Sequence, residues 1–336
     1  MKTIMCCLIL QNEDEKVKLN HIVTNVSTGR TVKSILKNEL QISNNLIKRL
    51  KYSKKIFLNS IPVHINKQIV EGDVIDVYVD FQEERDQMIP QKIDLDIIYE
   101  DDCLIVLNKQ PFIVVHPTFN HPNSTIANAL SYYYKSKGIE KIIRPVSRLD
   151  KDTSGIIVLA KNEFVQDALI KQMHSKVFKK EYIGVVSGII KNNSGIIDLP
   201  IGRKPGSIIM RQICQDGSAS ITKYEVVKHL INATVLKFDL ETGRTHQIRV
   251  HCLAIGHPLL GETLYCDSSI ISFYNIAQEK LDNELNSISL LKHINRQALH
   301  SHRITFIHPF TREYMELTAP IPQDILHLFD VLELDV

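Results

Sequence analysis

The sequence predicts an α+β fold, with a mixed, largely antiparallel central sheet and a small α+β module at the N-terminus. Three observations lead to this prediction. Strand-like runs often follow one another without a helical segment between them, which favours antiparallel pairing over βαβ units. A basic block and an acidic block near the N-terminus mark two different surfaces. With 336 residues, 44% of them hydrophobic, the chain is long enough for about two domains with real cores.

The two charge blocks give the predicted domain boundaries. Residues 30–67 contain nine bases and one acid, a net charge of +8, whereas residues 80–102 contain nine acids and two bases, a net charge of −7. A reversal of that size is typical of a linker between two surfaces. We therefore predict an N-terminal module over residues 15–80, an acidic linker over 81–92 and a larger domain over 93–325.

The N-terminal module is predicted to combine two short helices with a small sheet. Apolar residues at helical spacing predict a helix over residues 32–40, and Ser43 is a good N-cap for a second helix. Short strands are predicted over 54–59 and 74–79. The bases on and just after the second helix either contact nucleic-acid phosphates or form an ordinary solvated face. The candidate contacts are Lys48, Arg49, Lys51, Lys54 and Lys55.

The larger domain mixes strands with a few helices. Strands are predicted over residues 103–107, 156–160, 182–186, 223–227 and 233–240, with a closing hairpin over 304–307 and 314–317. Helices are predicted from Ser124 to about Tyr134, from Asn162 onward and over residues 245–254. Residues 268–297 are polar and are interpreted as a surface insertion.

The composition excludes several classes of protein. The 40 Lys and Arg against 38 Asp and Glu exclude a polycation, although a sum says nothing about local patches. The apolar run at residues 4–10 is too short to span a membrane, and six cysteines without a Cys-x-x-Cys pair indicate reduced thiols. We therefore expect a cytoplasmic protein. We also expect it to be a monomer. Without a glycine-rich nucleotide motif or a spaced set of metal ligands, we expect no cofactor and no metal.

The loop of residues 144–155 carries the first candidate for chemistry. It joins a helix to a buried strand, and such loops often hold catalytic groups. Arg148 stands two residues before Asp150 and would keep its carboxylate ionised, as a nucleophile or a base requires. The alternative is an ordinary turn, in which Asp150 accepts backbone N–H groups from the residues that follow.

Residues 240–251 carry the second candidate, where a strand ends at a glycine turn and a helix begins. Arg244, Thr245 and the first helical N–H groups would form an anion site suited to phosphate. The side chains that project from the next turns are those of His246, Gln247 and Arg249. The alternative is a helix whose arginines pair with acids on the surface.

Two further stretches are weaker when taken singly. Tyr182 with Lys179 and Lys180 would combine stacking with positive charge, as nucleic-acid binding requires, but also fits a half-buried strand residue. Residues 256–262 contain Leu260 and would form an apolar wall against a ligand, or simply a packed loop.

These four stretches, in this order, closely resemble the RluA/RluD family of pseudouridine synthases over about residues 93–320. Arg148-Leu149-Asp150 with Thr153-Ser154-Gly155 matches the family's catalytic loop, and Ser147 departs from it, because the family more often has His there. The N-terminal module resembles the S-four-type RNA-binding domain more weakly. It lacks the usual Gly in the turn at residues 53–55, and Ser60 stands where Gly often follows Asn.

The resemblance implies a fold of the pseudouridine synthase type and the isomerisation of uridine to pseudouridine in RNA. Asp150 would be the catalytic carboxylate, Tyr182 would stack on the target base, and Arg249 would pair with Asp150. The candidate substrate-binding residues are Arg148, Arg244, His246, Gln247 and Leu260. The partner is RNA, with large-subunit ribosomal RNA as the family's usual substrate and transfer RNA as the substrate of some members. The reaction needs no redox step, metal or phosphoryl donor.

Two other functions stay open at this point. A nucleosidase would cut the same bond and release the base, but such enzymes usually need two placed carboxylates, and nothing identifies Asp152 as the second. A ribosome-binding or assembly factor without catalysis would explain the basic module, but not the combination of Asp150, Tyr182 and Arg249.

Overall fold

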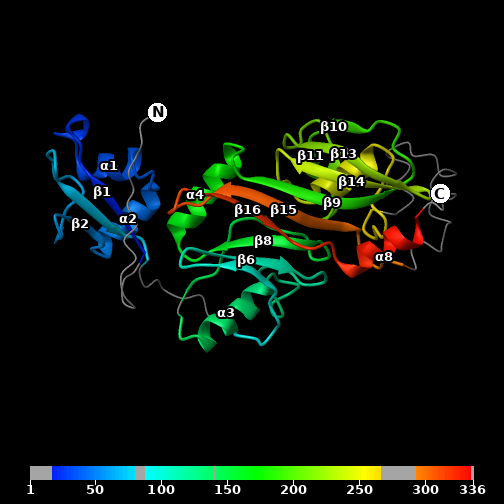
Figure 1. The fold of residues 1–336 in the computed structure, drawn as a ribbon, viewed down its shortest axis with the longest axis horizontal. Coiled ribbons are helices and arrows are strands. Elements are labelled where there is room, and N and C mark those ends of the chain that lie inside the picture. The colour runs from blue at the N-terminus through cyan, green and yellow to red at the C-terminus, as the bar shows by residue number, and fades with distance from the viewer. Residues whose placement is uncertain (1–16, 81–87, 140, 266–292, 334–336) are drawn as a thin grey trace.

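The computed structural model describes residues 17–80, 88–139, 141–265 and 293–333. Most of the predicted linker and of the predicted insertion over 268–297 lies outside these residues. Within them, no helix is both long and apolar enough to cross a membrane. A four-stranded sheet near the N-terminus and a ten-stranded sheet form the framework of the molecule (Figure 1).

The four-stranded sheet has the order β1-β4-β2-β3 and is antiparallel throughout. Its elements in chain order are β1 (Lys18–Ile22), η1 (Asn25–Ser27), α1 (Val32–Asn38), α2 (Asn44–Tyr52), β2 (Ile56–Leu58), β3 (Ile61–Pro62) and β4 (Val74–Tyr78). Thr31 and Ser43 cap the two helices, because their side-chain oxygens accept backbone N–H groups of the first turns. Both predicted helices and both predicted strands are confirmed.

The ten-stranded sheet has the order β10-β13-β14-β9-β15-β8-β6-β5, with β16 beside β15 and β7 beside β8. All of its pairs are antiparallel except β15 with β8, which confirms the predicted mixed, largely antiparallel sheet. Its strands are β5 (Ile97–Glu100), β6 (Leu104–Lys109), β7 (Arg144–Pro145), β8 (Ser154–Ala160), β9 (Lys179–Ser187), β10 (Ser194–Asp198), β13 (Ile221–Leu230), β14 (Ala233–Leu240), β15 (Leu299–Ile307) and β16 (Tyr314–Thr318).

A glycine permits the parallel contact between β8 and β15. Gly155 has φ +109, and a Cβ atom built on it would lie 2.2 Å from the carbonyl oxygen of Ser301 in β15. Any larger residue would therefore push the two strands apart just after the loop that carries Asp150.

The remaining elements of the described residues are four helices and a small hairpin. The helices are α3 (Ile126–Ser136), α4 (Glu163–His174), α5 (Gln247–Ala254) and α8 (Gln323–Val331), and the hairpin consists of β11 (Ile201–Arg203) and β12 (Arg211–Ile213).

The two faces of β9 point toward different helices. Tyr182 belongs to a buried cluster with Ile248 of α5, whereas Ile183 belongs to one with Ile325 of α8. Because successive strand residues alternate, even-numbered residues of β9 face the α5 side and odd-numbered residues face the α8 side.

Two helices begin later than the sequence predicts. The helix predicted from Ser124 begins after Thr125, whose side chain forms a capping box with Asn128, while Ser124 has φ +57. The helix predicted from Thr245 begins at Gln247, because His246 has φ +58 and interrupts the helical backbone.

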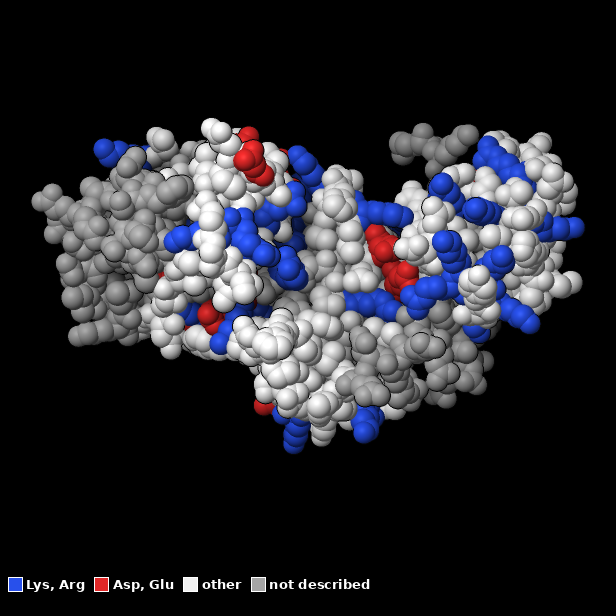
Figure 2. Space-filling view, turned by 180° about the vertical axis from the view of Figure 1, so that it is seen from behind, with Lys and Arg blue, Asp and Glu red and all other residues white. Residues whose placement is uncertain are grey.

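The N-terminal module contacts α4, the helix that follows β8 of the larger sheet. The guanidinium of Arg49 pairs with Glu163, and Nζ of Lys171 donates to the carbonyl of Gln41 at 2.5 Å. Arg49, a predicted RNA contact, therefore takes part in holding the module against α4. Figure 2 shows Lys and Arg gathered over this module, at the right of the view. Among the bases of α2 and the turn after it, Lys48, Lys51 and Lys54 are exposed. Lys55 is half-buried.

Candidate active site

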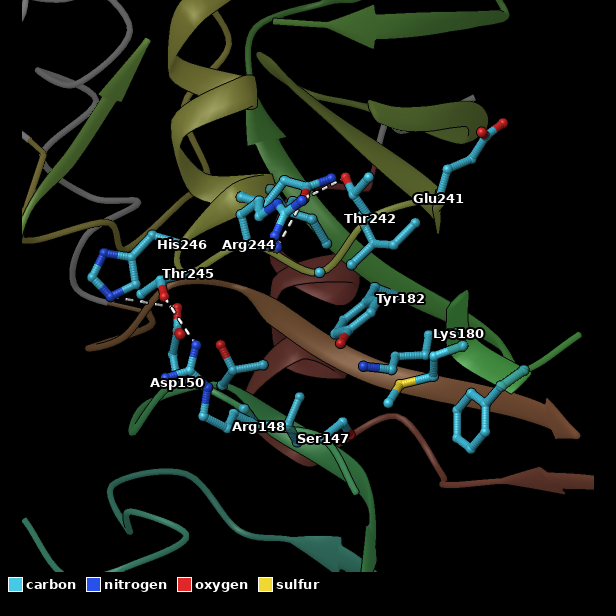
Figure 3. Close-up of a pocket in the computed structure, with 18 of the residues that line it drawn as sticks. Ser147, Arg148, Asp150, Lys180, Tyr182, Glu241, Thr242, Arg244, Thr245 and His246 are labelled. Carbon is cyan, nitrogen blue, oxygen red and sulfur yellow. Dashed lines mark hydrogen bonds and ion pairs between the residues drawn. The ribbon is translucent and has the colours of Figure 1, made fainter. Parts of the chain in front are cut away.

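A hollow of about 690 Å³ lies beside β9, a typical volume for a ligand site (Figure 3). Its walls are the loop before β8, the segment between β14 and α5, β9 itself and the C-terminal end of α4. It brings together the predicted site residues Arg148, Asp150, Tyr182, Arg244, His246, Gln247 and Arg249. Leu260 is not among the lining residues and packs instead with Ile183 and Ile325 on the α8 side. The predicted role of Leu260 in the pocket therefore finds no support in its position.

Asp150 lies in a turn directly before β8, where its backbone carbonyl accepts the N–H of Thr153 at 3.2 Å. One carboxylate oxygen, Oδ2, accepts from Nη1 of Arg249 at 3.3 Å and lies 3.9 Å from Nε2 of His246. The side chain is 25% exposed, so a substrate in the hollow can reach it. The turn expected as the alternative is thus present, but it uses the backbone of Asp150 and leaves the carboxylate facing the pocket.

Arg249 is buried, and Glu262 holds it in place. Nε and Nη2 of Arg249 each donate to a different oxygen of Glu262, both at 2.7 Å, which leaves Nη1 for Asp150. Burial opposes the charged form of Arg249, but Glu262 outweighs this effect and raises the pKa of the guanidinium. Arg249 therefore stays cationic and links the two carboxylates. Sequence reasoning missed Glu262, although it lies in the segment that contains Leu260.

Two tyrosines lie near the contact between Asp150 and Arg249. The ring of Tyr182 points into the hollow from β9, and its burial raises the pKa of the hydroxyl, so the phenol stays neutral (Figure 3). The hydroxyl of Tyr265 accepts the N–H of Arg211 and lies 2.7 Å from Nδ1 of His246. Burial lowers the pKa of His246. When the Tyr265 hydroxyl donates its hydrogen bond to Nδ1, the neutral imidazole carries its own proton on Nε2, which faces Asp150.

Gln247 organises the segment between β14 and α5. Its side-chain oxygen accepts from the backbone N–H of Arg244 and from the hydroxyl of Thr242, and its amide donates to Ile221 and Thr222. The side chain is buried and its amide is occupied by protein groups, so Gln247 shapes the loop. The predicted anion site loses two N–H groups to these internal bonds, because the N–H of Gln247 also bonds to Arg244.

Arg148 and Arg244 lie at the rim of the hollow. Both side chains are exposed. Arg148 donates to the hydroxyl of Thr245 at 3.2 Å, and Arg244 donates to the carbonyl of Ala219 at 3.3 Å. Each guanidinium keeps further N–H groups that can contact a phosphate.

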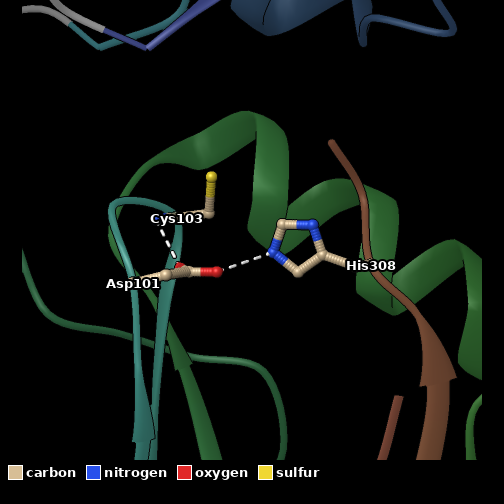
Figure 4. Close-up of side chains that lie close together, drawn as sticks. All are labelled: Asp101, Cys103 and His308. Atoms are coloured by element: carbon tan, nitrogen blue, oxygen red, sulfur yellow. Dashed lines mark hydrogen bonds and ion pairs between the residues drawn. The ribbon is translucent and has the colours of Figure 1, made fainter. Parts of the chain in front are cut away.

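A separate group of possible metal ligands lies at the turn between β5 and β6 (Figure 4). Ligand atoms of Asp101, Cys103 and His308 lie within 4.8 Å of one another. The carboxylate of Asp101, however, already accepts the N–H groups of Cys103 and Leu104 and the hydroxyl of Tyr99, and contacts His308 at 2.9 Å. Burial also raises the pKa of the Cys103 thiol, which disfavours the thiolate that a metal requires. These contacts explain the cluster as a structural link between β6 and the β15–β16 hairpin.

Replacing Asp101 with Asn is expected to destabilise the protein by about 2 kcal/mol at pH 7. Burial alone would raise the pKa of Asp101, but contacts with His308, the two backbone N–H groups and Tyr99 lower it to about 2, against 3.8 normally. Because the folded-state pKa is depressed, the contribution is complete above pH 4 and shrinks as the pH falls toward 2. Urea unfolding at pH 7 and pH 3 measures it. Asp102→Asn, at the exposed neighbour, is the control, and a pH-independent difference would contradict the prediction.

Comparison with known proteins identifies the family. Residues 103–254 match the family model for RNA pseudouridylate synthase, and residues 19–75 match that for the N-terminal domain of the RluD ribosomal pseudouridine synthase. The pocket residues from Arg148 to Arg249 fall inside the first match. Two human proteins, RNA Pseudouridylate Synthase Domain Containing 4 and 1, share the fold. The first is 22% identical and covers 71% of this chain and 94% of its own, with TM-score 0.54, and the second is 23% identical with TM-score 0.51.

Relatives match most of the chain. An uncharacterized RNA pseudouridine synthase of Bacillus subtilis, YjbO, is 36% identical over 291 residues, covering 86% of this chain and 95% of its own. The ribosomal large subunit pseudouridine synthase D of Blochmanniella floridana is 36% identical over 298 residues, covering 87% and 91%. That of Haemophilus influenzae is 35% identical and covers 80% of each chain. Sequence and fold thus agree, and the chain belongs to the family of RNA pseudouridine synthases.

Proposed function

We propose that this protein isomerises specific uridines to pseudouridine in RNA, with large-subunit ribosomal RNA as the substrate and Asp150 as the catalytic carboxylate. The observation that carries the proposal is the contact of a solvent-accessible Asp150 with the buried Arg249, which Glu262 fixes from the other side. The relatives named ribosomal large subunit pseudouridine synthase D support the choice of RNA.

The pocket residues divide the work of the reaction. Uridine must leave the base stack to reach Asp150, and the ring of Tyr182 offers the displaced base a surface to stack on. The bond between N1 and C1′ breaks, the uracil turns, and a bond forms between C5 and C1′. The proton on C5 then leaves and N1 takes up a proton, so that the product is an isomer of the substrate. The carboxylate of Asp150 starts this sequence by attacking C1′, attacking the base or taking a ribose proton. Arg249 holds this carboxylate by its hydrogen bond to Oδ2 in all three cases.

Tritium release tests the function. The protein is incubated with RNA that carries tritium at C5 of uridine, since only isomerisation replaces that atom while the base stays in the chain. Release of tritium to water with pseudouridine in the RNA supports the proposal. Free uracil instead would indicate a nucleosidase, and RNA binding without either product would indicate an assembly factor.

We further propose that residues 15–80 form an RNA-binding module, joined by residues 81–92 to a catalytic domain over 93–325. The protein would act as a cytoplasmic monomer. The exposed Lys48, Lys51 and Lys54 on and after α2 support RNA binding by the module. Arg49 and Lys55 are less available, because Arg49 pairs with Glu163 and Lys55 is half-buried.

The double variant Lys51→Ala/Lys54→Ala is expected to bind RNA more weakly and with a flatter salt dependence. Each lost phosphate contact lowers the slope of log K against log[salt] by about 0.7 to 0.9. Filter binding between 50 and 300 mM KCl measures the slope. Lys135→Ala, at an exposed lysine of α3, should leave it unchanged. A wild-type slope in the double variant would contradict a role for these two lysines.

A further inference from the structure

The charges that line the hollow do not balance. Its two acidic residues are already paired: Asp150 with Arg249, and Glu241 with Lys176 and Lys223. Three lining cations have no acidic partner among the described residues, namely Arg148, Lys180 and Arg244. The walls therefore present an excess of positive charge, which an anionic ligand would neutralise.

Lys180 is the deepest of the three. It is half-buried, whereas Arg148 and Arg244 are exposed at the rim. Its neighbours in the lining include the apolar side chains of Met173 and Phe178, and Figure 3 shows its ammonium directed into the hollow beside Tyr182. Burial, and to a lesser extent repulsion from Arg148, lowers the pKa of Lys180 to about 8. A lysine kept in such surroundings without an acid is costly unless a ligand supplies the anion.

We propose that Lys180 and Arg148 together bind one backbone phosphate of the RNA strand next to the flipped uridine. This inference rests on the proposed function. Lys180 and Tyr182 are two residues apart on the same face of β9, about 7 Å along the strand, so a base stacked on Tyr182 places its backbone within reach of Lys180. Arg148 approaches from the loop that carries Asp150. Two cations that line the same hollow, neither of them paired with an acid among the described residues, suit a phosphodiester better than an uncharged base edge.

Lys180→Met tests the contact, because it removes the charge while keeping a flexible apolar stem. Lys179→Met is the matched control. The sequence groups Lys179 with Tyr182 and Lys180, but Lys179 does not line the hollow, and its exposed side chain faces the α8 side of β9. The probe is a transcript of large-subunit ribosomal RNA with tritium at C5 of uridine. The readouts are the Kd between 50 and 300 mM KCl and the single-turnover rate of tritium release at saturating protein.

For Lys180→Met we expect a Kd raised about three- to tenfold, a salt slope lowered by about 0.7 to 0.9, and a saturating rate within about threefold of wild type. Lys179→Met should match wild type in all three, and Lys180→Arg should restore the slope. An unchanged slope in Lys180→Met overturns the proposal. An unchanged slope together with a lower saturating rate of tritium release in Lys180→Met would indicate instead that the ammonium acts on the uracil. If wild type binds with the expected Lys180-dependent slope but releases no tritium, the proposed function fails and the phosphate contact stands.

Discussion

Asp150→Asn is expected to lower tritium release from C5-labelled RNA by at least about 100-fold, and to background if the carboxylate is the nucleophile. Asn has nearly the same shape but carries no charge and is neither a base nor a useful nucleophile. The change should leave the fold intact, because Arg249 keeps both of its bonds to Glu262. RNA affinity should stay within about threefold of wild type, since the phosphate contacts remain.

Asp152→Asn is the matched control for this variant. Asp152 is the nearest other acid in the same loop and the one residue that a two-carboxylate nucleosidase mechanism would recruit. We expect near-wild-type tritium release from this variant. If Asp150→Asn kept full activity, or Asp152→Asn lost it with no change in stability, the assignment of Asp150 as the sole catalytic carboxylate would be wrong.

Glu262→Gln is expected to lower kcat by roughly 10- to 100-fold with little change in KM. Glu262 does not line the pocket, and it acts through Arg249. A glutamine offers one oxygen where the carboxylate offers two, so the guanidinium is free to rotate away from its contact with Asp150. Misplacement of a catalytic group by about 1 Å can cost about 100-fold in rate. Single- and multiple-turnover tritium release separates kcat from KM.

A second arginine–glutamate pair provides the control. Glu181 accepts from Arg303 at 2.6 Å on the α8 side of β9, next to Tyr182 in sequence but facing away from the pocket. Glu181→Gln should leave kcat unchanged, and Glu262→Asp should restore part of it. Equal losses in the two Gln variants, in step with lost stability, would indicate that Glu262 is only structural.

The sequence predicted the elements of the fold well, because their signals are local. A helix cap such as Ser43 predicts the start of a helix, and a continuous apolar run such as residues 156–160 predicts a buried strand. Short connections between strands indicate antiparallel pairing. The predicted starts of two helices were wrong. Ser124 and His246 have left-handed backbone, and they contact Gln91 and Tyr265, which lie far along the chain and give no local signal. The parallel contact of β8 with β15 joins residues far apart in sequence and has no local signal.

The site was predictable only in part. Asp150, Tyr182 and Arg249 carry recognisable motifs, and the structure brings them to one hollow. The motifs do not show on which side of β9 the segment with Leu260 packs. Leu260 was therefore assigned to the pocket, although its side chain packs on the α8 side. They also do not separate a ligand-binding amide from a buried one, as at Gln247. Glu262 had only a weak signal, an acid at the end of the segment that contains Leu260, and its two bonds to Arg249 required coordinates.

Mapping pseudouridines in cells tests the central claim most directly. Large-subunit ribosomal RNA is sequenced for pseudouridine from cells that lack this protein and carry either the wild-type gene or the Asp150→Asn variant at equal protein level. The account predicts at least one uridine that is converted with wild type and left unmodified with the variant. If the strain with the Asp150→Asn variant showed the same set of pseudouridines as the strain with the wild-type gene, this result would contradict the account.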